Sequence, residues 1–457
     1  MTKRAVLFVD VEKIFEGAPL ALVEISGVPL VKRIVLDLKR AGIVDVLVAL
    51  NKPSAPVEIF LHRERLGVRV LRMTSSDLQA ELLKDKERGA LLVGADRLYD
   101  FRALSALAGE ELNGYKVLVG VDLKTPEALP EAERRYTTND GKLIENFSDV
   151  KALSEGFSGR EVGADVFRGD ALITALNLSS EERRDYARAL VERGEAALFD
   201  IGNGFVQFIA SRADVRRAEQ RIWRYIWKET DGLHARWNKL LALPFIKLLL
   251  KTPITPNMIS VMGVFVSLAA GYFFSVGNYW YSIIGAILSY VSSLFDHMDG
   301  SIARLKSMES AFGSYFETVC DFVYYFSFAV GISVGLYRAS GNQLYLFLGG
   351  ALLFGTLVSL FTLSYQRKEF AKDPSKLAGQ AHGVFEANAH NPIYRFGRTT
   401  YFVVRRPVLP YYLFILTVLN LLPVVLFIAA LGANLFWTIQ LYSNRLFRHD
   451  TRSSAET

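Results

Sequence analysis

Residues 295–321 read FDHMDGSIARLKSMESAFGSYFETVCD and lie between two long apolar segments of the chain. Four of their acidic side chains are Asp296, Asp299, Glu317 and Asp321. A charged side chain at the centre of a bilayer costs about 2.5–3.5 kcal/mol on insertion scales. Carboxylates that are concentrated beside membrane-length segments therefore indicate a functional site.

The segments around this stretch have the length and apolarity of membrane-spanning helices. Residues 256–444 predict about six spans, because a span needs about 20 apolar residues. The expected spans are 256–276, 279–298, 313–336 and 343–365, with two more that share 408–444 and meet near Leu421–Pro423. The C-terminal half is therefore predicted to be an all-α, six-helix transmembrane domain.

Basic residues are distributed unevenly between the two ends of these expected spans. Residues 302–311, residues 366–406 and the tail from Arg445 are rich in Arg and Lys, whereas the connections at the opposite ends are nearly uncharged. Cytoplasmic loops carry such an excess of basic residues. We therefore expect a multi-pass protein of the cell membrane, with both termini and the acidic stretch on the cytoplasmic side.

The composition of the whole chain excludes several other classes. Hydrophobic residues make up 51% of the 457 residues, and the net charge is +6. The basic residues flank apolar helices, so the charge does not indicate nucleic-acid binding. The single cysteine, Cys320, excludes an internal disulfide and a CxxC metal site. The N-terminus predicts a first β-strand rather than a signal peptide.

The N-terminal half alternates strand and helix patterns. Strands are expected at 5–10, 44–50, 68–73, 90–96 and 115–122, and helices at 29–42 and 56–66. This alternation predicts an α/β domain with a mostly parallel sheet. Ligands bind such sheets at the carboxyl ends of the strands, so Asp10 and Asp96 are expected near any site there.

Four parts are expected along the chain. A cytosolic α/β domain covers 1–210, and a linker with an amphipathic juxtamembrane helix covers 211–255. The membrane domain covers 256–445, and a tail covers 446–457. The juxtamembrane segment mixes Arg and Lys with Trp223, Trp227 and Trp237, which is typical of a helix in the headgroup plane. The alternative is a soluble helix packed on the first domain.

The spacing of the four carboxylates predicts a metal site. Asp296 and Asp299 are three residues apart and Glu317 and Asp321 are four apart, so each pair shares a helix face. A short connection makes the two helices antiparallel neighbours, which lets the pairs converge. Converging carboxylates repel one another without a cation. With a bound cation they form a site of oxygen ligands that suits Mg²⁺ or Mn²⁺. Enzymes that catalyse displacement at phosphorus commonly use two such ions, which stabilise the attacking and the leaving oxygen.

The acidic stretch fits the pattern D-x2-D-G-x2-A-R-x8-G-x3-(acid)-x3-D. Its positions are filled by Asp296, Asp299, Gly300, Ala303, Arg304, Gly313, Glu317 and Asp321. The pattern resembles the signature of the CDP-alcohol phosphotransferase family, which normally has aspartate in place of Glu317. The segments DGLHARWNK (231–239) and KTPITPNMIS (251–260) also resemble this family, and the resemblance covers about 228–445.

The resemblance implies a reaction and a role for each residue. A CDP-alcohol donates its phospho-alcohol group to an acceptor alcohol, such as a phosphorylated polyol or a lipid, and CMP leaves. Asp321 would be the base and a shared metal ligand beside Asp296, Asp299 and Glu317. The nucleotide would lie against Gly300, Ala303, Arg304 and Gly313. Members of this family are typically homodimers.

An acceptor-binding site is expected in the basic loop before the fifth span. Arg395 and Arg398 lie there, with Arg405 and Arg406 close behind. Arginine binds phosphate through paired hydrogen bonds. The alternative is that these residues only anchor the loop on the cytoplasmic side of the membrane.

Residues 3–210 resemble a sugar-phosphate nucleotidyltransferase domain. The likeness includes LLVGADRLYD (91–100), where that family places its metal-binding aspartate, and TTNDGKLIENFSD (137–149), which resembles a late hairpin. In place of a glycine-rich loop with arginine, the chain has VEKIFEGAPLALVEISG (11–27). A phosphate cradle needs unhindered backbone N–H groups and positive charge. We therefore expect that this domain has lost cytidylyltransferase activity.

Three other functions remain open from the sequence. The fusion resembles archaeal and thermophile proteins that make di-myo-inositol phosphate, which implies a bifunctional inositol-1-phosphate cytidylyltransferase and di-myo-inositol-phosphate-phosphate synthase. A cation or proton transporter would also place carboxylates in a membrane, although it would show internal repeats. The third alternative is a catalytically dead scaffold.

Overall fold

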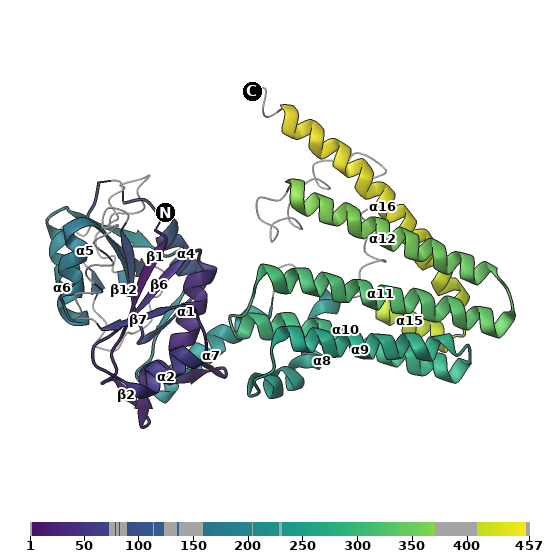
Figure 1. Ribbon diagram of the computed structural model, residues 1–457, viewed down its shortest axis with the longest axis horizontal. Coiled ribbons are helices and arrows are strands. Elements are labelled where there is room, and N and C mark those ends of the chain that lie inside the picture. The colour runs from purple at the N-terminus through teal and green to yellow at the C-terminus, as the bar shows by residue number, and fades with distance from the viewer. Residues whose placement is uncertain are drawn as a thin grey trace. The chain divides into compact units, whose positions relative to one another are not determined.

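The structure, a computed structural model, describes residues 2–72, 78, 82, 89–112, 114–122, 135–136, 159–202, 204–227, 231–370 and 409–453 (Figure 1). The chain divides into two compact units. Unit 1 comprises Met1–Ile226 and Arg304–Met308, and unit 2 comprises Trp227–Ala303 and Glu309–Thr457. The segment expected to link the domains, 211–255, is therefore shared between the two units.

Unit 1 is built on a mostly parallel β-sheet, as the sequence predicted. The strand order is β13-β10-β12-β8-β1-β6-β7, and β11 pairs with β12. Neighbours are parallel except that β12 runs antiparallel to β8, β10 and β11. The strands are β1 (Arg4–Val9), β6 (Asp45–Leu50), β7 (Arg69–Arg72), β8 (Ala90–Gly94), β10 (Val117–Asp122), β11 (Arg135–Tyr136), β12 (Gly159–Phe167) and β13 (Ala196–Asp200).

Helices cover both faces of this sheet (Figure 1). The helices are α1 (Leu30–Arg40), α2 (Ala55–Arg63), α4 (Phe101–Gly109), α5 (Gly169–Leu176), α6 (Ser180–Glu192) and α7 (Arg212–Trp223). Leu172 of α5 and Leu190 of α6 pack against Val6 and Phe8 of β1 in one buried cluster. Strands β1 and β10 are nearly continuous hydrophobic runs because both of their faces are buried.

Several short elements connect these strands and helices in unit 1. The hairpin expected at 137–149 lies outside the described residues. The short elements are β2 (Ile14–Phe15), β3 (Ala18–Pro19), η1 (Leu20–Leu22), β4 (Glu24–Ile25), β5 (Val28–Pro29), β9 (Arg97–Tyr99), β14 (Val206–Phe208) and η3 (Arg224–Ile226).

Unit 2 is helical in its described part. Its helices are α8 (Leu233–Leu250), α9 (Pro256–Ser275), α10 (Tyr279–Leu305, whose last two residues belong to unit 1), α11 (Ala311–Ser340), α12 (Leu344–Phe370), α15 (Leu409–Val418) and α16 (Leu422–Ser453). Within the described ranges, α9, α11 and α12 are long and apolar enough to cross a membrane. The break between α15 and α16 falls beside the expected boundary near Leu421–Pro423. The count of six spans stays a prediction.

Helix α8 has the polarity of a helix that faces lipid. On its buried side, Asn238 Oδ1 accepts hydrogen bonds from the hydroxyls of Tyr290 (3.3 Å) and Tyr411, and Lys239 pairs with Asp231. The buried side also carries Ala242, Ile246 and Leu250, so apolar residues lie on both sides of α8, whereas the exposed side of a helix on a water-facing surface is polar. The exposed side of α8 carries large apolar side chains, namely Leu233, Trp237, Leu240, Leu241, Phe245 and Leu248.

Glycine lets α9 and α11 approach each other closely. A Cβ added at Gly335 would lie 2.0 Å from the carbonyl oxygen of Phe274, and one added at Gly331 would lie 2.4 Å from that of Gly271. Small residues at helix contacts allow this approach in membranes, where packing drives association. The α9–α11 contact therefore requires glycine at these positions.

A matched pair of substitutions tests this contact. Gly335→Ala forces the two backbones apart, and overpacking of this kind costs typically about 1–3 kcal/mol. Gly350→Ala on α12 is the control, because its Cβ would meet nothing within 4 Å. We expect the thermal midpoint of the purified chain to fall for Gly335→Ala and to hold or rise for Gly350→Ala, since Ala favours a helix over Gly by about 1 kcal/mol. Equal midpoints would contradict the close contact.

Candidate active site

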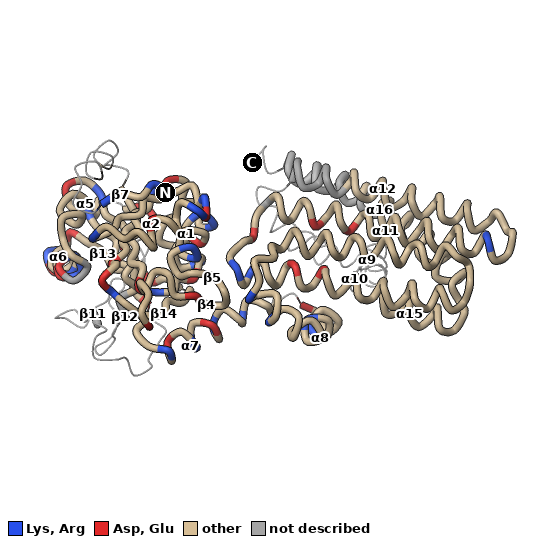
Figure 2. Tube along the Cα trace, turned by 60° about the horizontal axis from the view of Figure 1, so that its bottom comes forward, with Lys and Arg blue, Asp and Glu red and all other residues tan. Residues whose placement is uncertain are grey.

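Three of the four predicted carboxylates meet in unit 2. Asp296 and Asp299 on α10 and Glu317 on α11 each offer an oxygen, and these oxygens lie within 4.8 Å of one another. Asp299 is 5% exposed, Asp296 is half-buried and Glu317 is exposed. Red positions along α10 and α11 mark acidic residues in otherwise mostly uncharged helices (Figure 2).

Asp321 lies one turn beyond Glu317 on the same face of α11. Among the described residues, the group within 4.8 Å comprises the other three carboxylates and does not include it. Its Oδ1 atom is buried. Of the four predicted carboxylates, three therefore fall within one group of 4.8 Å, and Asp321 lies outside it.

The donor set of this cluster suits a hard divalent cation. All three members offer carboxylate oxygen, the ligand type that Mg²⁺ and Mn²⁺ prefer. Without a counter-charge, carboxylates this close repel one another, and the buried Asp299 is the least solvated of them. The ring of His297 lies beside the cluster, with its Nδ1 3.8 Å from Asp296 Oδ2. The residues present fit a bound divalent metal.

Helix α9 contributes a partner that the sequence reasoning missed. The hydroxyl of Ser260 donates a hydrogen bond to Asp299 Oδ2 at 2.5 Å. A cavity beside the carboxylates is lined from α9, α10 and α11, and Ser267, Ser292 and Tyr324 lie on its wall. Ser260 is the last residue of the segment KTPITPNMIS, which resembles the family, so the sequence indicated the segment. Its contact with Asp299 could not be predicted, because it depends on how α9 packs on α10.

The residues predicted to bind nucleotide lie at the adjoining helix ends. Gly300 and Ala303 follow Asp299 along α10, and Gly313 is in the first turn of α11, where its N–H donates to Ser310 Oγ (3.0 Å). Arg304 belongs to unit 1, and its Nε donates to the carbonyl oxygen of Tyr225 at 2.9 Å. The predicted acceptor residues Arg395 and Arg398 lie outside the described residues.

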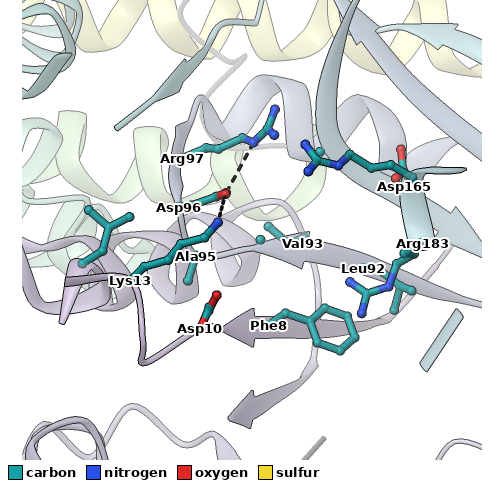
Figure 3. Close-up of a pocket in the computed structure, with 14 residues that line it drawn as sticks. Phe8, Asp10, Lys13, Leu92, Val93, Ala95, Asp96, Arg97, Asp165 and Arg183 are labelled. Carbon is teal, nitrogen blue, oxygen red and sulfur yellow. Dashed lines mark hydrogen bonds and ion pairs between the residues drawn. The ribbon is translucent and has the colours of Figure 1, made fainter. Parts of the chain in front are cut away.

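Unit 1 holds a second cavity at the carboxyl ends of β1 and β8 (Figure 3). Asp10 and Asp96 line it, as expected for such a sheet. Lys13 Nζ lies 2.8 Å from Asp96 Oδ2, and Arg97 Nε lies 3.4 Å from Asp96 Oδ1. Arg183 lines the same cavity.

The cations around Asp96 control its ionisation. Burial alone would raise the pKa of this carboxyl, but Arg97 and Lys13 outweigh burial and hold the pKa below its usual value. Asp96 is therefore a carboxylate whose charge is already compensated by two side chains of the same unit. Such a carboxylate is a weaker ligand for a metal than an uncompensated one.

The chain is similar to known proteins over both units. The profile of the family CDP-alcohol phosphatidyltransferase matches residues 253–392. Proteins named bifunctional IPC transferase and DIPP synthase match from Aquifex aeolicus (20% identity, 78% of this chain and 81% of the relative) and Rubrobacter xylanophilus (22%, 79% and 83%). An archaetidylinositol phosphate synthase from Pyrococcus horikoshii is 30% identical over 122 residues, which are 26% of this chain and 57% of that protein.

Solved structures are similar to about half of the chain. One is an inositol-1-phosphate CTP transferase from T. maritima, with 15% identity and a TM-score of 0.36 over 48% of this chain and 96% of that chain. Another is a putative glucose-1-phosphate thymidylyltransferase from Bacillus anthracis, with 13% identity and a TM-score of 0.36 over 48% and 94%.

The family profile covers the stretch that contains the carboxylate cluster, and the relatives extend over most of the chain. The chain is a membrane protein and a transferase of substituted phosphate groups, and residues 253–392 form its CDP-alcohol phosphatidyltransferase domain.

Proposed function

We propose that the chain transfers the phospho-alcohol group of a CDP-alcohol to an acceptor alcohol and releases CMP. The observation that carries this proposal is the meeting of Asp296, Asp299 and Glu317 within 4.8 Å, inside the region that matches the family. The acceptor oxygen forms a bond to the phosphorus of the donor alcohol. The bond from that phosphorus to CMP breaks, and the acceptor proton passes to a base.

The carboxylates divide these tasks among them. Asp296, Asp299 and Glu317 would hold a divalent cation, Mg²⁺ or Mn²⁺, and Asp321 would share a second ion. Bound cations neutralise charge that develops on the phosphate oxygens. Asp321, one helical turn from Glu317, takes the acceptor proton. Ser260 holds Asp299 in place through its hydrogen bond.

The remaining predicted site residues bind the substrates. Gly300, Ala303 and Gly313 allow the nucleotide to approach the helices closely, and Arg304 contacts the diphosphate. Arg395 and Arg398 bind a phosphate of the acceptor. Two copies of the chain form a homodimer in the membrane, with the active site on the cytoplasmic side.

The names of the relatives favour an inositol-bearing substrate. One relative is an archaetidylinositol phosphate synthase, and others are bifunctional IPC transferase and DIPP synthases. The second candidate function is therefore a bifunctional enzyme in which unit 1 makes the CDP-alcohol. Against it stands the pairing of Lys13 and Arg97 with Asp96, which supports a unit 1 without cytidylyltransferase activity.

Helix α8 extends the membrane contact of the protein. Its exposed apolar side chains lie in the interfacial layer of the bilayer, and Lys247 and Lys251 lie near headgroup phosphates. The buried pairing of Lys239 with Asp231 supports this orientation, because it keeps polar groups on the inner side of the helix.

One prediction concerns Asp321 as the general base. Purified protein with Mg²⁺ and a CDP-alcohol, such as CDP-inositol, CDP-glycerol or CDP-diacylglycerol, releases CMP when a suitable acceptor is present. Asp321→Asn lowers this release by about 10²–10⁴-fold, the range for a lost general base. CMP is measured by chromatography across a matrix of donors and acceptors. Robust turnover by the Asp321→Asn protein would remove the base assignment, and no release with any pair would favour a scaffold.

The second prediction concerns the metal ligands. We expect Asp299→Asn to abolish high-affinity Mn²⁺ binding, measured by electron paramagnetic resonance without substrate. Ser260→Ala should weaken Mn²⁺ affinity by about tenfold, because partners of metal ligands typically contribute 10–100-fold. Ser275→Ala is the control, since Ser275 lies at the other end of α9 and bonds the Tyr272 carbonyl oxygen. Unchanged Mn²⁺ binding in Asp299→Asn would place the metal elsewhere.

The third prediction separates the two candidate functions. With CTP, Mg²⁺ and inositol 1-phosphate, the full chain should release no pyrophosphate, because Lys13 and Arg97 already compensate the charge of Asp96. Pyrophosphate is measured by an enzyme-coupled assay. Release that disappears in Asp96→Asn would establish the bifunctional enzyme and refute the loss of activity in unit 1.

A further inference from the structure

A short segment that comprises the end of α10 and the start of its connection to α11 is part of unit 1. This segment, Arg304–Met308, groups with Met1–Ile226 rather than with the helices on either side of it. Leu305, Lys306 and Ser307 are all buried. The last two residues of α10, Arg304 and Leu305, therefore belong to unit 1.

Arg33 on α1 holds this segment. Its guanidinium Nη2 donates to the carbonyl oxygen of Leu305 at 2.7 Å and to that of Ile25 at 2.9 Å. Its Nη1 donates to Ser307 Oγ at 3.1 Å. Arg33 is 2% exposed, so water does not replace these acceptors. Two of the three acceptors therefore come from the connecting segment.

The surroundings of Arg33 make these acceptors important. Burial lowers the pKa of Arg33, and burial raises the pKa of the neighbouring Asp37 to about 7 although Arg33 opposes that rise. Burial therefore disfavours the charged forms of both Arg33 and Asp37. A buried charged donor that loses its acceptors is strongly unfavourable. The carbonyl of Leu305 and the hydroxyl of Ser307 are thus required by unit 1.

The conformation of the segment also indicates that it is held from outside. Ser307 has a φ of 53°, in the left-handed region that a residue with a side chain seldom adopts. Such a conformation persists where surrounding contacts determine it. Arg304 adds a contact of its own through Nε to the Tyr225 carbonyl oxygen at 2.9 Å.

We propose that Arg33 is a positioning residue for the transfer reaction, which fixes the α10–α11 connection and with it the last turn of α10. This turn carries Arg304 and continues the helix of Asp296 and Asp299. The inference rests on the proposed function where it concerns substrate binding. Unit 1 would then have a role that needs no cytidylyltransferase activity, because the hydrogen bonds of Arg33 require only α1 and the segment Arg304–Met308.

Limited trypsin digestion of the full chain tests the contact without turnover. Trypsin cleaves after Arg304 and Lys306, and Lys306 is buried in the intact protein. We expect Arg33→Met to speed cleavage at these two bonds by about tenfold or more, because local opening exposes them. Arg33→Lys keeps one donor and should give an intermediate rate. Arg4→Met is the control, since Arg4 pairs with Asp45 in the same unit.

Kinetics of the same variants test the positioning role. The KM for the CDP-alcohol should rise by about tenfold in Arg33→Met and by less in Arg33→Lys. The Mn²⁺ affinity of both Arg33 variants should stay at the wild-type value. The control Arg4→Met should keep the wild-type KM. If Arg33→Met does not fold, Arg33→Lys carries both measurements. Wild-type cleavage rates in the Arg33 variants would overturn the contact, and an unchanged KM beside faster cleavage would overturn the positioning role. Absence of CMP release in the wild type would refute only the proposed function.

Discussion

Repulsion among three carboxylates is the constraint on which unit 2 depends. Asp296, Asp299 and Glu317 come within 4.8 Å of one another although like charges at this distance disfavour a common site. The fold keeps them together through contacts that are unrelated to charge. Gly331 and Gly335 bring α9 against α11, and the α9 helix then supplies a hydroxyl to the buried Asp299. The three carboxylates together form a donor set that suits a divalent cation.

Much of this site could be predicted from spacing in the sequence. Intervals of three and four residues place the carboxylates on helix faces, and a short connection makes α10 and α11 neighbours. Spacing cannot reveal which residue of another helix reaches the cluster, and so Ser260 was missed. Spacing also cannot show that Glu317, and not Asp321, lies within 4.8 Å of the α10 carboxylates. The two residues are one turn apart on α11, and their distances to α10 depend on how the two helices pack.

Five strands of the unit 1 sheet were also predicted, because hydrophobic runs alternate with helix patterns over the first 122 residues, whereas β12 and β13 were not. The antiparallel direction of β12 was not predicted either, since the direction of a strand does not follow from its own residues. The altered loop after β1 predicted a poor phosphate cradle. It could not predict that Lys13 of this loop would pair with Asp96, a contact across 83 residues of sequence. Nor could it predict that Arg304–Met308 would join this unit.

The polar contacts of α8 bear on the order in which the protein is assembled. Asn238 is 0% exposed and accepts its hydrogen bonds from Tyr290 and Tyr411, the second of which follows it by 173 residues. During synthesis α8 emerges long before α15, so its amide cannot gain this partner until nearly the whole chain has been made. The packing of α8 is therefore completed late in synthesis. A chain that is stalled on the ribosome before residue 411 lacks the hydrogen bond from Tyr411 to Asn238.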